Sequence, residues 1–425
     1  MCRFAHVLTP NRKKHSDYAM NRFYLCILSW AMTLSCLADV TISGHVKSLM
    51  SRDAIVDAEI RIPGSNASVI TNEDGYFTFK VSELPARLVV SALGYRNNTV
   101  TQRYLTDHLE DAEIWLTPET RILDAVTVYT AEDLVKTSIA KIVQNYSQEP
   151  ERLSCFYRET TRKQSRYVNL SEAVMSLFKT DYGKSVWRDQ VYILKGRSLI
   201  SQRTKDSLAI KVMGGPHESV ALDLVKNRDM FLHDEDLDAY RFTMVEGTSI
   251  DERPQFVIKF EPTQERPYAL YHGTFYIDME HLAFSRIELS LDMSDRQKAT
   301  DVMLVKKPFG LRFRPRELTT TISYHYDGEC FRLSYMRNFF HFNCDWKKRW
   351  ISTTYRVVSE MVVTDYVADE VPRSSKGSFR QRDVLDPKAE NFNDPAFWES
   401  YNILEPSESL EHAVLKLKKR AEKKK

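Results

Sequence analysis

The sequence is poor in cysteine, glycine and proline, and it has no long apolar run beyond its first residues. Of 425 residues, 6 are cysteine, 13 are glycine and 15 are proline. Collagen-like and low-complexity chains need far more glycine or proline, so both classes are excluded. No charge-free apolar stretch beyond the leader reaches about 18 residues, which excludes a protein with several membrane-spanning helices. The apolar content of 43% and charged content of 28% are typical of a packed globular chain.

The segment Met20–Ala38 has the three-part layout of a secretory signal peptide. Arg22 gives a basic start, an apolar run follows, and small residues end the segment. We therefore expect residues 1–38 to be a leader and the chain to be exported, to the periplasm or to the outer membrane. A start at Met20 fits this layout better than a start at Met1, for which a long basic leader is the alternative. Lipid attachment at Cys36 is a second alternative, although the usual leucine three residues before the cysteine is missing.

Without the leader, the chain has neither a basic excess nor many cysteines. The formal charge changes from +2 to about −2, so we expect no nucleic-acid partner. Cys155, Cys330 and Cys344 are the cysteines that remain. Three cysteines cannot form a disulfide framework, and a large core must therefore stabilise the fold.

Residues 39–118 alternate apolar and polar positions in short runs that end at turn residues. Such runs predict a small antiparallel β-sandwich. Asp74-Gly75 is predicted to form a two-residue hairpin turn, because glycine readily takes a positive φ. The predicted strands are 42–46, 58–62, 76–81, 87–92 and 112–116.

Four motifs in this region occur in the order of a known family. They are I-S-G-x-V from Ile42, D-A-x-I-x-I from Asp57, T-N-E-D-G-Y-F from Thr71 and L-G-Y from Leu93. The order resembles the carboxypeptidase-regulatory-like domain, a transthyretin-like sandwich of exported envelope proteins in Gram-negative bacteria. The resemblance implies an accessory domain that carries no catalytic residues.

Residues 119–150 are predicted to connect two domains. Residues 121–128 alternate as a short linker strand does. Thr130 then has the position of a helix cap, and the apolar residues up to Tyr146 fall on one side of a helix. This segment therefore predicts one amphipathic helix that packs on a core.

Residues 151–405 predict an α+β domain with a large, curved antiparallel sheet. Most of its runs alternate apolar and polar residues, as in a sheet with one wet face. Asp327-Gly328 is predicted to be a two-residue turn that places His325 opposite Cys330. The expected fold class is therefore mainly β with some α: a transthyretin-like antiparallel sandwich, then this sheet domain. The predicted strands are 153–159, 167–180, 191–194, 255–260, 273–277, 284–291, 318–326, 331–342 and 353–363.

Further motifs in the second domain carry a resemblance without a function. C-F-Y-R-E from Cys155, C-D-W-K-K-R-W from Cys344 and F-W-E-S-Y-N-I-L-E-P from Phe397 are similar to words in uncharacterised exported proteins with the same first domain. The strands near Tyr276 and Phe284 faintly resemble open half-barrel lipoprotein carriers. That resemblance implies a concave apolar surface for acyl chains.

The sequence contains few residues that point to chemistry. His325 and Cys330 are weak candidates for metal ligands. Arg158, Glu159 and Glu172 could form an acid–base group in a cleft, although a charge pair on the solvated face of a sheet is the favoured explanation. Neither a G-x-S-x-G elbow nor an H-E-x-x-H helix is present. We expect no catalytic residues, no metal and no cofactor.

Two segments combine bases with apolar residues and could contact a partner or a membrane. The first consists of Trp346, Lys347, Lys348, Arg349 and Trp350. The second is the basic C-terminal tail, residues 406–425, which could rest on an anionic surface. The sequence therefore favours a non-enzymatic envelope protein whose sheet domain binds a lipid, a peptide or a protein. The alternative is an envelope hydrolase with an unrecognised active site in residues 151–405.

Overall fold

The structure is a computed structural model. It describes residues 40–65, 67–119, 129–200, 211–212, 215–230, 232–306, 309–346, 352–368, 377–381 and 383–400, and residues 404, 407, 410, 412 and 414–416. The predicted leader, the predicted linker strand 121–128, residues 347–350 and the basic end of the tail lie outside the described residues.

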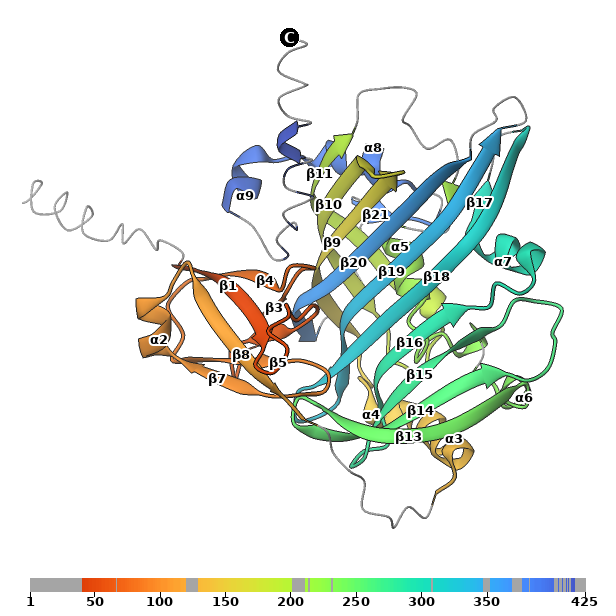
Figure 1. Ribbon diagram of the computed structural model, residues 1–425, viewed down its shortest axis with the longest axis horizontal. Coiled ribbons are helices and arrows are strands. Elements are labelled where there is room, and N and C mark those ends of the chain that lie inside the picture. Colours follow the sequence, from red (N-terminus) through yellow and green to blue (C-terminus); the bar gives the residue numbers. More distant parts are fainter. Residues whose placement is uncertain are drawn as a thin grey trace, which may run out of the picture.

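The N-terminal domain is a sandwich of two four-stranded sheets (Figure 1). One sheet has the order β4-β1-β8-β6 and the other β3-β2-β5-β7. Most pairs are antiparallel as predicted, but β1 and β8 pair in parallel. Apolar side chains of both sheets form one core between them. The elements are β1 (Val40–Ser48), β2 (Glu59–Arg61), β3 (Ser68–Ile70), β4 (Tyr76–Val81), β5 (Arg87–Ser91), β6 (Tyr95–Arg96), β7 (Asn98–Thr101), α2 (Gln102–Asp107) and β8 (Ala112–Pro118).

Asp74-Gly75 forms a turn, but the predicted hairpin is wrong. Strand β3 pairs with β2, whereas β4 pairs with β1, so the turn carries the chain from one sheet to the other. Gly75 has the expected positive φ of 68°. A Cβ atom there would also lie 2.8 Å from the Val46 carbonyl oxygen, so the side chain of any other residue would clash with the backbone of β1.

The second domain is built on one antiparallel sheet of eleven strands, which confirms the predicted fold class. Its order is β13-β14-β15-β16-β18-β19-β20-β9-β10-β11-β21. The first strand of the domain, β9, lies between β10 and β20, so the sheet is complete only when distant parts of the chain meet. Its strands are β9 (Glu151–Lys163), β10 (Arg166–Lys179), β11 (Gln190–Ile200), β13 (Tyr240–Ile250), β14 (Arg253–Pro262), β15 (Tyr271–Asp278), β16 (Phe284–Leu291), β18 (Leu311–Tyr326), β19 (Phe331–Trp346), β20 (Thr353–Ala368) and β21 (Ser378–Phe379), and β12 (Lys211–Val212) pairs separately with β17 (Leu304–Lys306).

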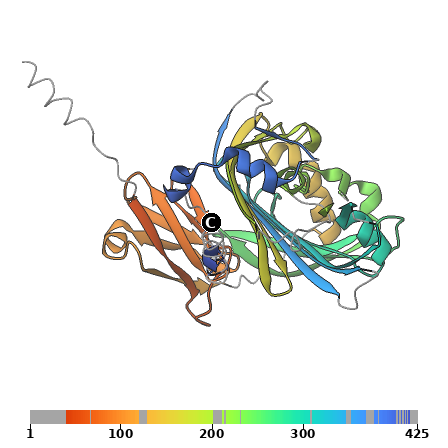
Figure 2. The same cartoon turned by 90° about the horizontal axis from the view of Figure 1, so that it is seen from above.

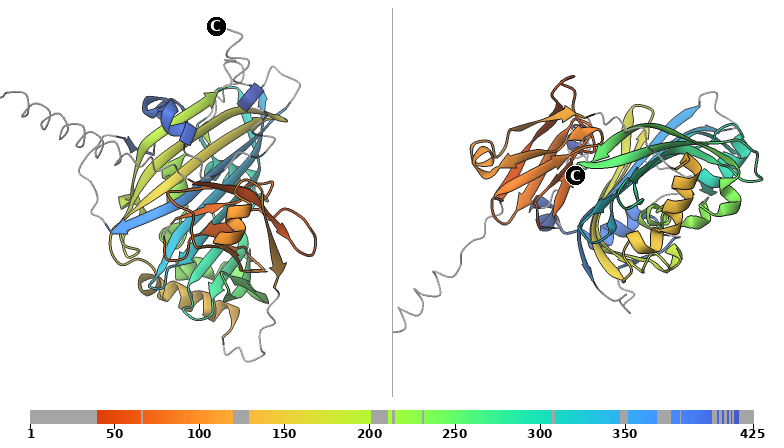
Figure 3. Two further views of the ribbon diagram at one scale, coloured as in Figure 1. Left: turned by 90° about the vertical axis from the view of Figure 1, so that its left-hand side faces the viewer. Right: turned by 90° about the horizontal axis from the view of Figure 1, so that it is seen from below.

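Helices fill the concave face of this sheet, and the sandwich packs on the convex face (Figures 2 and 3). Buried residues of α3, α5 and α7 join one core with the inward side chains of the strands. None of the described helices is long and apolar enough to cross a membrane. The helices are α3 (Ala131–Ala140), α4 (Ile142–Asn145), η1 (Val186–Arg188), α5 (Pro216–Ala221), η2 (Arg228–Met230), α6 (Asp234–Leu237), α7 (Arg296–Met303), α8 (Leu385–Ala389), η3 (Glu390–Phe392) and α9 (Pro395–Ser400).

The helix predicted after the linker begins directly after Thr130, its predicted cap residue. The Thr130 hydroxyl accepts a hydrogen bond from the Asp133 backbone, and the Asp133 side chain bonds back to Thr130. The helix is not continuous to Tyr146, because it breaks at Lys141 into α3 and α4. The break turns the chain so that the Tyr146 hydroxyl can donate to the Phe284 carbonyl oxygen, at 2.6 Å.

A buried carboxylate ties the segment on the concave face to the sheet. Asp223 is fully buried and accepts bonds from Lys179 of β10 at 2.6 Å and from Tyr324 of β18 at 2.5 Å. Beside it, Lys226 lies 2.6 Å from Asp189. Two lysines and two aspartates thus balance one another inside the domain. Burial, followed by the neighbouring Lys179, lowers the pKa of Lys226 to about 8.

We predict that Asp223→Asn destabilises the protein by about 3–5 kcal/mol, because it leaves two buried lysines with one carboxylate. Urea unfolding at neutral pH measures the loss. Asp229→Asn is the matched control, since the Asp229 side chain is 76% exposed and its loss costs less than about 0.5 kcal/mol. Equal stability of the two variants would contradict the role given to Asp223.

Candidate functional site

A cleft lies between the sandwich and the convex face of the large sheet. It consists of a cavity of about 80 Å³ and a cavity of about 320 Å³. Six residues line both cavities: Glu59, Ser68, Asp251, His325, Tyr326 and Ser334. We call the two together the interdomain cleft, because Glu59 and Ser68 belong to the sandwich and the other four to the sheet domain.

Asp251 clamps the two domains together at one wall of the cleft. Its carboxylate accepts hydrogen bonds from Arg61 at 2.7 Å and from Asn97 at 2.8 Å, both in the sandwich. Burial alone favours the neutral acid, but Arg61 outweighs it and lowers the pKa of Asp251. Asp251 and Glu252 have φ values of 51° and 63°, which non-glycine residues rarely adopt. The tight turn between β13 and β14 thus holds a strained backbone at an interdomain contact.

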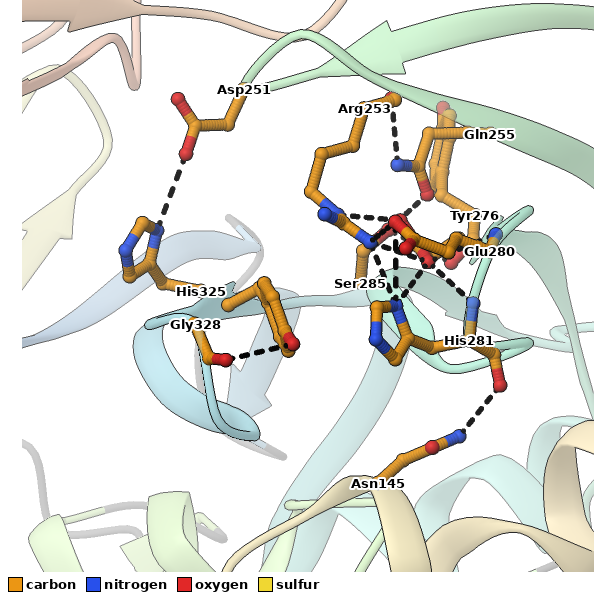
Figure 4. Close-up of polar contacts among 12 residues, drawn as sticks. Asn145, Asp251, Arg253, Gln255, Tyr276, Glu280, His281, Ser285, His325 and Gly328 are labelled. Carbon is orange, nitrogen blue, oxygen red and sulfur yellow. Dashed lines mark hydrogen bonds and ion pairs between the residues drawn. The ribbon is translucent and has the colours of Figure 1, made fainter.

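Arg253 is the centre of a polar cluster beside Asp251 (Figure 4). Its guanidinium contacts both carboxylate oxygens of Asp278, at 2.8 and 3.0 Å, and Glu280 at 2.9 Å. It also lies 2.8 Å from Nδ1 of His281 and 4.5 Å from the centre of the Tyr326 ring. A cation already lies among these acceptors and offsets part of their negative charge.

Asp278, Glu280 and His281 are the described residues whose grouping could hold a metal ion. Their ligand atoms lie within 4.8 Å of one another. A metal would have to displace the Arg253 guanidinium, which donates to both acids and to the histidine. The geometry therefore fits a protein-supplied cation better than a bound metal. Sequence reasoning missed this cluster, because Arg253 and Asp278 are joined only by the pairing of β14 with β15.

The predicted neighbours His325 and Cys330 do not meet. The β18–β19 hairpin pairs His325 with Arg332 and Tyr326 with Phe331, so the predicted register is wrong. The turn has four residues because the Asp327 carboxylate accepts the backbone N–H groups of Glu329 and Cys330. Burial raises the pKa of the Cys330 thiol to about 11, and a protonated thiol is a poor metal ligand.

Arg158 and Glu159 lie on opposite faces of the sheet, so the alternative of an acid–base group with Glu172 does not form. The favoured prediction of a solvated charge pair is wrong as well, because the Arg158 and Glu172 side chains are buried. Arg158 is on the convex face and binds Glu172 at 2.7 Å, beneath the carbonyl oxygen of Leu404. Glu159 is on the concave face, where its neighbours include Tyr157. The cause is simple: successive residues of a strand point to opposite faces.

Glu159 is a half-buried acid without a basic neighbour among its recorded interactions. Burial raises its pKa to about 7, and the nearby Asp386 carboxylate adds to the shift. A hydrogen bond from the Tyr157 hydroxyl, at 3.4 Å, acts in the opposite direction.

The segment from Trp346 to Trp350 falls at the end of a hairpin. Trp346 is the last residue of β19 and pairs with Leu311, and Lys347, Lys348, Arg349 and Trp350 lie outside the described residues. Of the tail, Leu410 is buried, whereas its lysine-rich end is not described.

The comparisons with known proteins identify the first domain. Residues 42–128 match the family model of the CarboxypepD_reg-like domain. This agrees with the resemblance carried by the four sequence motifs. No curated protein matches the chain.

Three solved structures are similar to parts of the chain at low identity. A DUF1329 family protein from Desulfovibrio piger is 9% identical, with 56% of this chain and 92% of that chain covered, at a TM-score of 0.22. The Pseudomonas aeruginosa MucA/MucB structure gives 11% identity, 57% and 99% coverage, and a TM-score of 0.16. A protein from Bacteroides fragilis, described as membrane-associated and of unknown function, gives 12%, 77% and 98%, and 0.14. With TM-scores below 0.5, these likenesses support no inference about function.

We predict that Asp251→Asn loosens the contact between the CarboxypepD_reg-like domain and the sheet domain. Asparagine tolerates the left-handed turn, so the variant removes the charge and little else. Urea unfolding at pH 7 should show a loss of about 1–2 kcal/mol. Because the folded pKa of Asp251 is lowered, this contribution is present above the ordinary aspartate pKa and is lost as the pH falls. The exposed Asp238→Asn is the control, and a loss that persists undiminished in acid would contradict the explanation.

We predict that Glu159→Gln changes the pH dependence of stability. The folded protein binds one proton more than the unfolded chain between the ordinary glutamate pKa and pH 7, so native stability falls as the pH rises through that window. The glutamine variant should be more stable than the native protein by about 2–3 kcal/mol at pH 8 and equal to it near pH 4. Thermal or urea unfolding across this range, with the exposed Glu246→Gln as a control, tests the sign. A variant whose stability difference does not grow with pH would overturn it.

Proposed function

We propose that this chain is an exported, non-enzymatic cell-envelope protein that binds a peptide or protein partner in the interdomain cleft. The observation that carries the proposal is the cleft itself, whose walls come from both domains. Asp251 and Arg61 hold those walls together, and a Tyr335–Asp57 hydrogen bond of 3.1 Å does so at another point. A site with fixed walls loses little conformational freedom on binding.

Glu59 supports a partner that brings a positive charge. It lies on β2, lines both cavities and makes no recorded ion pair or side-chain hydrogen bond within the described parts of the chain. Its neighbour Arg61 is already held by Asp251. A lysine or arginine of a bound peptide would neutralise Glu59, with the aromatic side chains of Tyr326 and Tyr366 nearby.

The packing of the concave face favours a peptide ligand over a lipid ligand. In the carrier hypothesis, an acyl chain would occupy the apolar hollow of the curved sheet. The described residues of that hollow are packed against one another in a single core that includes α3, α5 and α7. A lipid there would have to displace side chains that stabilise the fold.

The separation of Arg158 from Glu159 also favours a binding protein over the envelope hydrolase considered as the alternative. Arg158 forms an ion pair with Glu172 and donates a hydrogen bond to the Leu404 carbonyl oxygen. Arg197 forms a second ion pair with Glu172. Groups that are paired and covered in this way stabilise the fold and have no access to a substrate.

Native mass spectrometry of the protein purified from its own envelope without refolding tests the proposal. We predict an added mass that fragments as a peptide or protein. Glu59→Arg should raise the dissociation constant at least tenfold and so lower the bound fraction, since reversing a charge at a close contact costs more than the roughly 1.4 kcal/mol that a factor of ten represents. Glu83→Arg, at an exposed position of the same domain, should leave the bound fraction unchanged. An added mass that fragments as a phospholipid, a clean apo mass, or equal loss in both variants would overturn the proposal.

A further inference from the structure

The end of the large sheet that lies farthest from the interdomain cleft collects arginines from three strands. Arg162 lies one residue before the end of β9, and Arg356 lies near the start of β20. Arg312, Arg314 and Arg316 lie near the start of β18. The start of β18 pairs with the end of β19 at the top of Figure 1, away from the sandwich. We call these five residues the basic end of the sheet.

Strand register places Arg162 and Arg356 side by side. They are direct partners in the pairing of β9 with β20, so their side chains share the convex face. His341 of β19 is the next residue in the same row. Like charges opposite each other destabilise a sheet. The Arg162 guanidinium lies 5.0 Å from the centre of the Tyr167 ring, but no such contact offsets the repulsion at Arg356 among the described residues.

Acids do not balance the basic end. Asp345 binds Arg314 at 2.7 Å, and Glu317 lies 4.0 Å from His341. For Arg312, Arg316 and Arg356, no ion pair is recorded within the described parts of the chain. The pKa of His341 shows the effect of these charges. Burial lowers this pKa most, and Arg356 and Arg316 lower it further. An anionic partner complements such a surface.

An exposed aromatic residue lies just beyond the arginines. Phe309 is 98% exposed and precedes β18 by two residues. It is three residues from Arg312, or about 10 Å along an extended chain. An aromatic ring a short distance beyond basic groups matches the depth of a membrane interface, where rings enter the acyl boundary and cations meet phosphates.

We propose that the basic end of the sheet docks on an anionic membrane surface, with the arginines on lipid phosphates and Phe309 at the interface. The proposal concerns a surface separate from the interdomain cleft, and it stands or falls independently of the partner that the cleft binds.

Flotation with lipid vesicles tests the proposal on the full chain. We expect the protein to bind vesicles of equimolar phosphatidylcholine and phosphatidylglycerol, to ignore vesicles of phosphatidylcholine alone, and to bind less at high salt. The variant Arg162→Gln/Arg356→Gln should lower the partition coefficient roughly thirty-fold, at about 1 kcal/mol for each arginine near the surface. Removing two opposed like charges should leave thermal stability equal or higher. Phe309→Ser should reduce binding further.

The control variant Arg87→Gln/Arg103→Gln removes two exposed positive charges from the sandwich. It should bind vesicles as the native protein does, and the lysine-rich tail is present in every protein compared. Absence of binding to anionic vesicles would overturn the proposal, and so would equal losses in the two double variants. Binding to a soluble polyanion such as heparin without binding to vesicles would overturn it in favour of a polysaccharide partner.

Discussion

The bond between Lys179 and Asp223 is the interaction on which the sheet domain depends. A curved sheet of eleven strands has a large concave face, and apolar side chains must cover that face. The chain fills it with short helices, of which α5 and α6 have only six and four residues and cannot be stable alone. Asp223 follows α5 and reaches both β10 and β18. One buried carboxylate thus fixes the filling segment to strands from both halves of the sheet.

The order of the strands then decides what each face can do. Because β9 pairs with β20, the beginning and the end of the domain meet in the middle of the sheet. The convex face of these strands carries Phe156 and Val362, which pack against Ile70 of the sandwich and Leu404. The sandwich therefore docks where β9 pairs with β20. The interdomain cleft exists because this apolar contact is small and polar residues surround it.

Much of the fold could be predicted from the sequence, because alternation is a local signal. Nine strand predictions in the sheet domain correspond to observed strands, whereas β13 was missed because Gly247 and a bulge interrupt its alternation. The sites could be predicted far less well. Arg61 and Asp251 are 190 residues apart, and no local pattern joins them. The split of Arg158 from Glu159 was available from strand geometry, since neighbours on a strand cannot face the same cleft. The turn at Asp327 depended on a side-chain hydrogen bond that no composition rule reveals.

The two proposed surfaces lie at opposite ends of the same strands. On β18, Arg314 belongs to the basic end and Ser323 lines the interdomain cleft, nine residues later. That interval corresponds to roughly 30 Å of extended strand. The chain carries a formal charge near zero, so the positive end arises from a separation of charge along the sheet rather than from an excess over the whole molecule. A protein that rests on an anionic surface through one end of a rigid sheet holds the other end at a fixed height above it. That arrangement leaves the cleft, with Glu59 in its wall, open to a cationic partner in solution. The rigidity of the eleven-stranded sheet then serves to keep the cleft at that height.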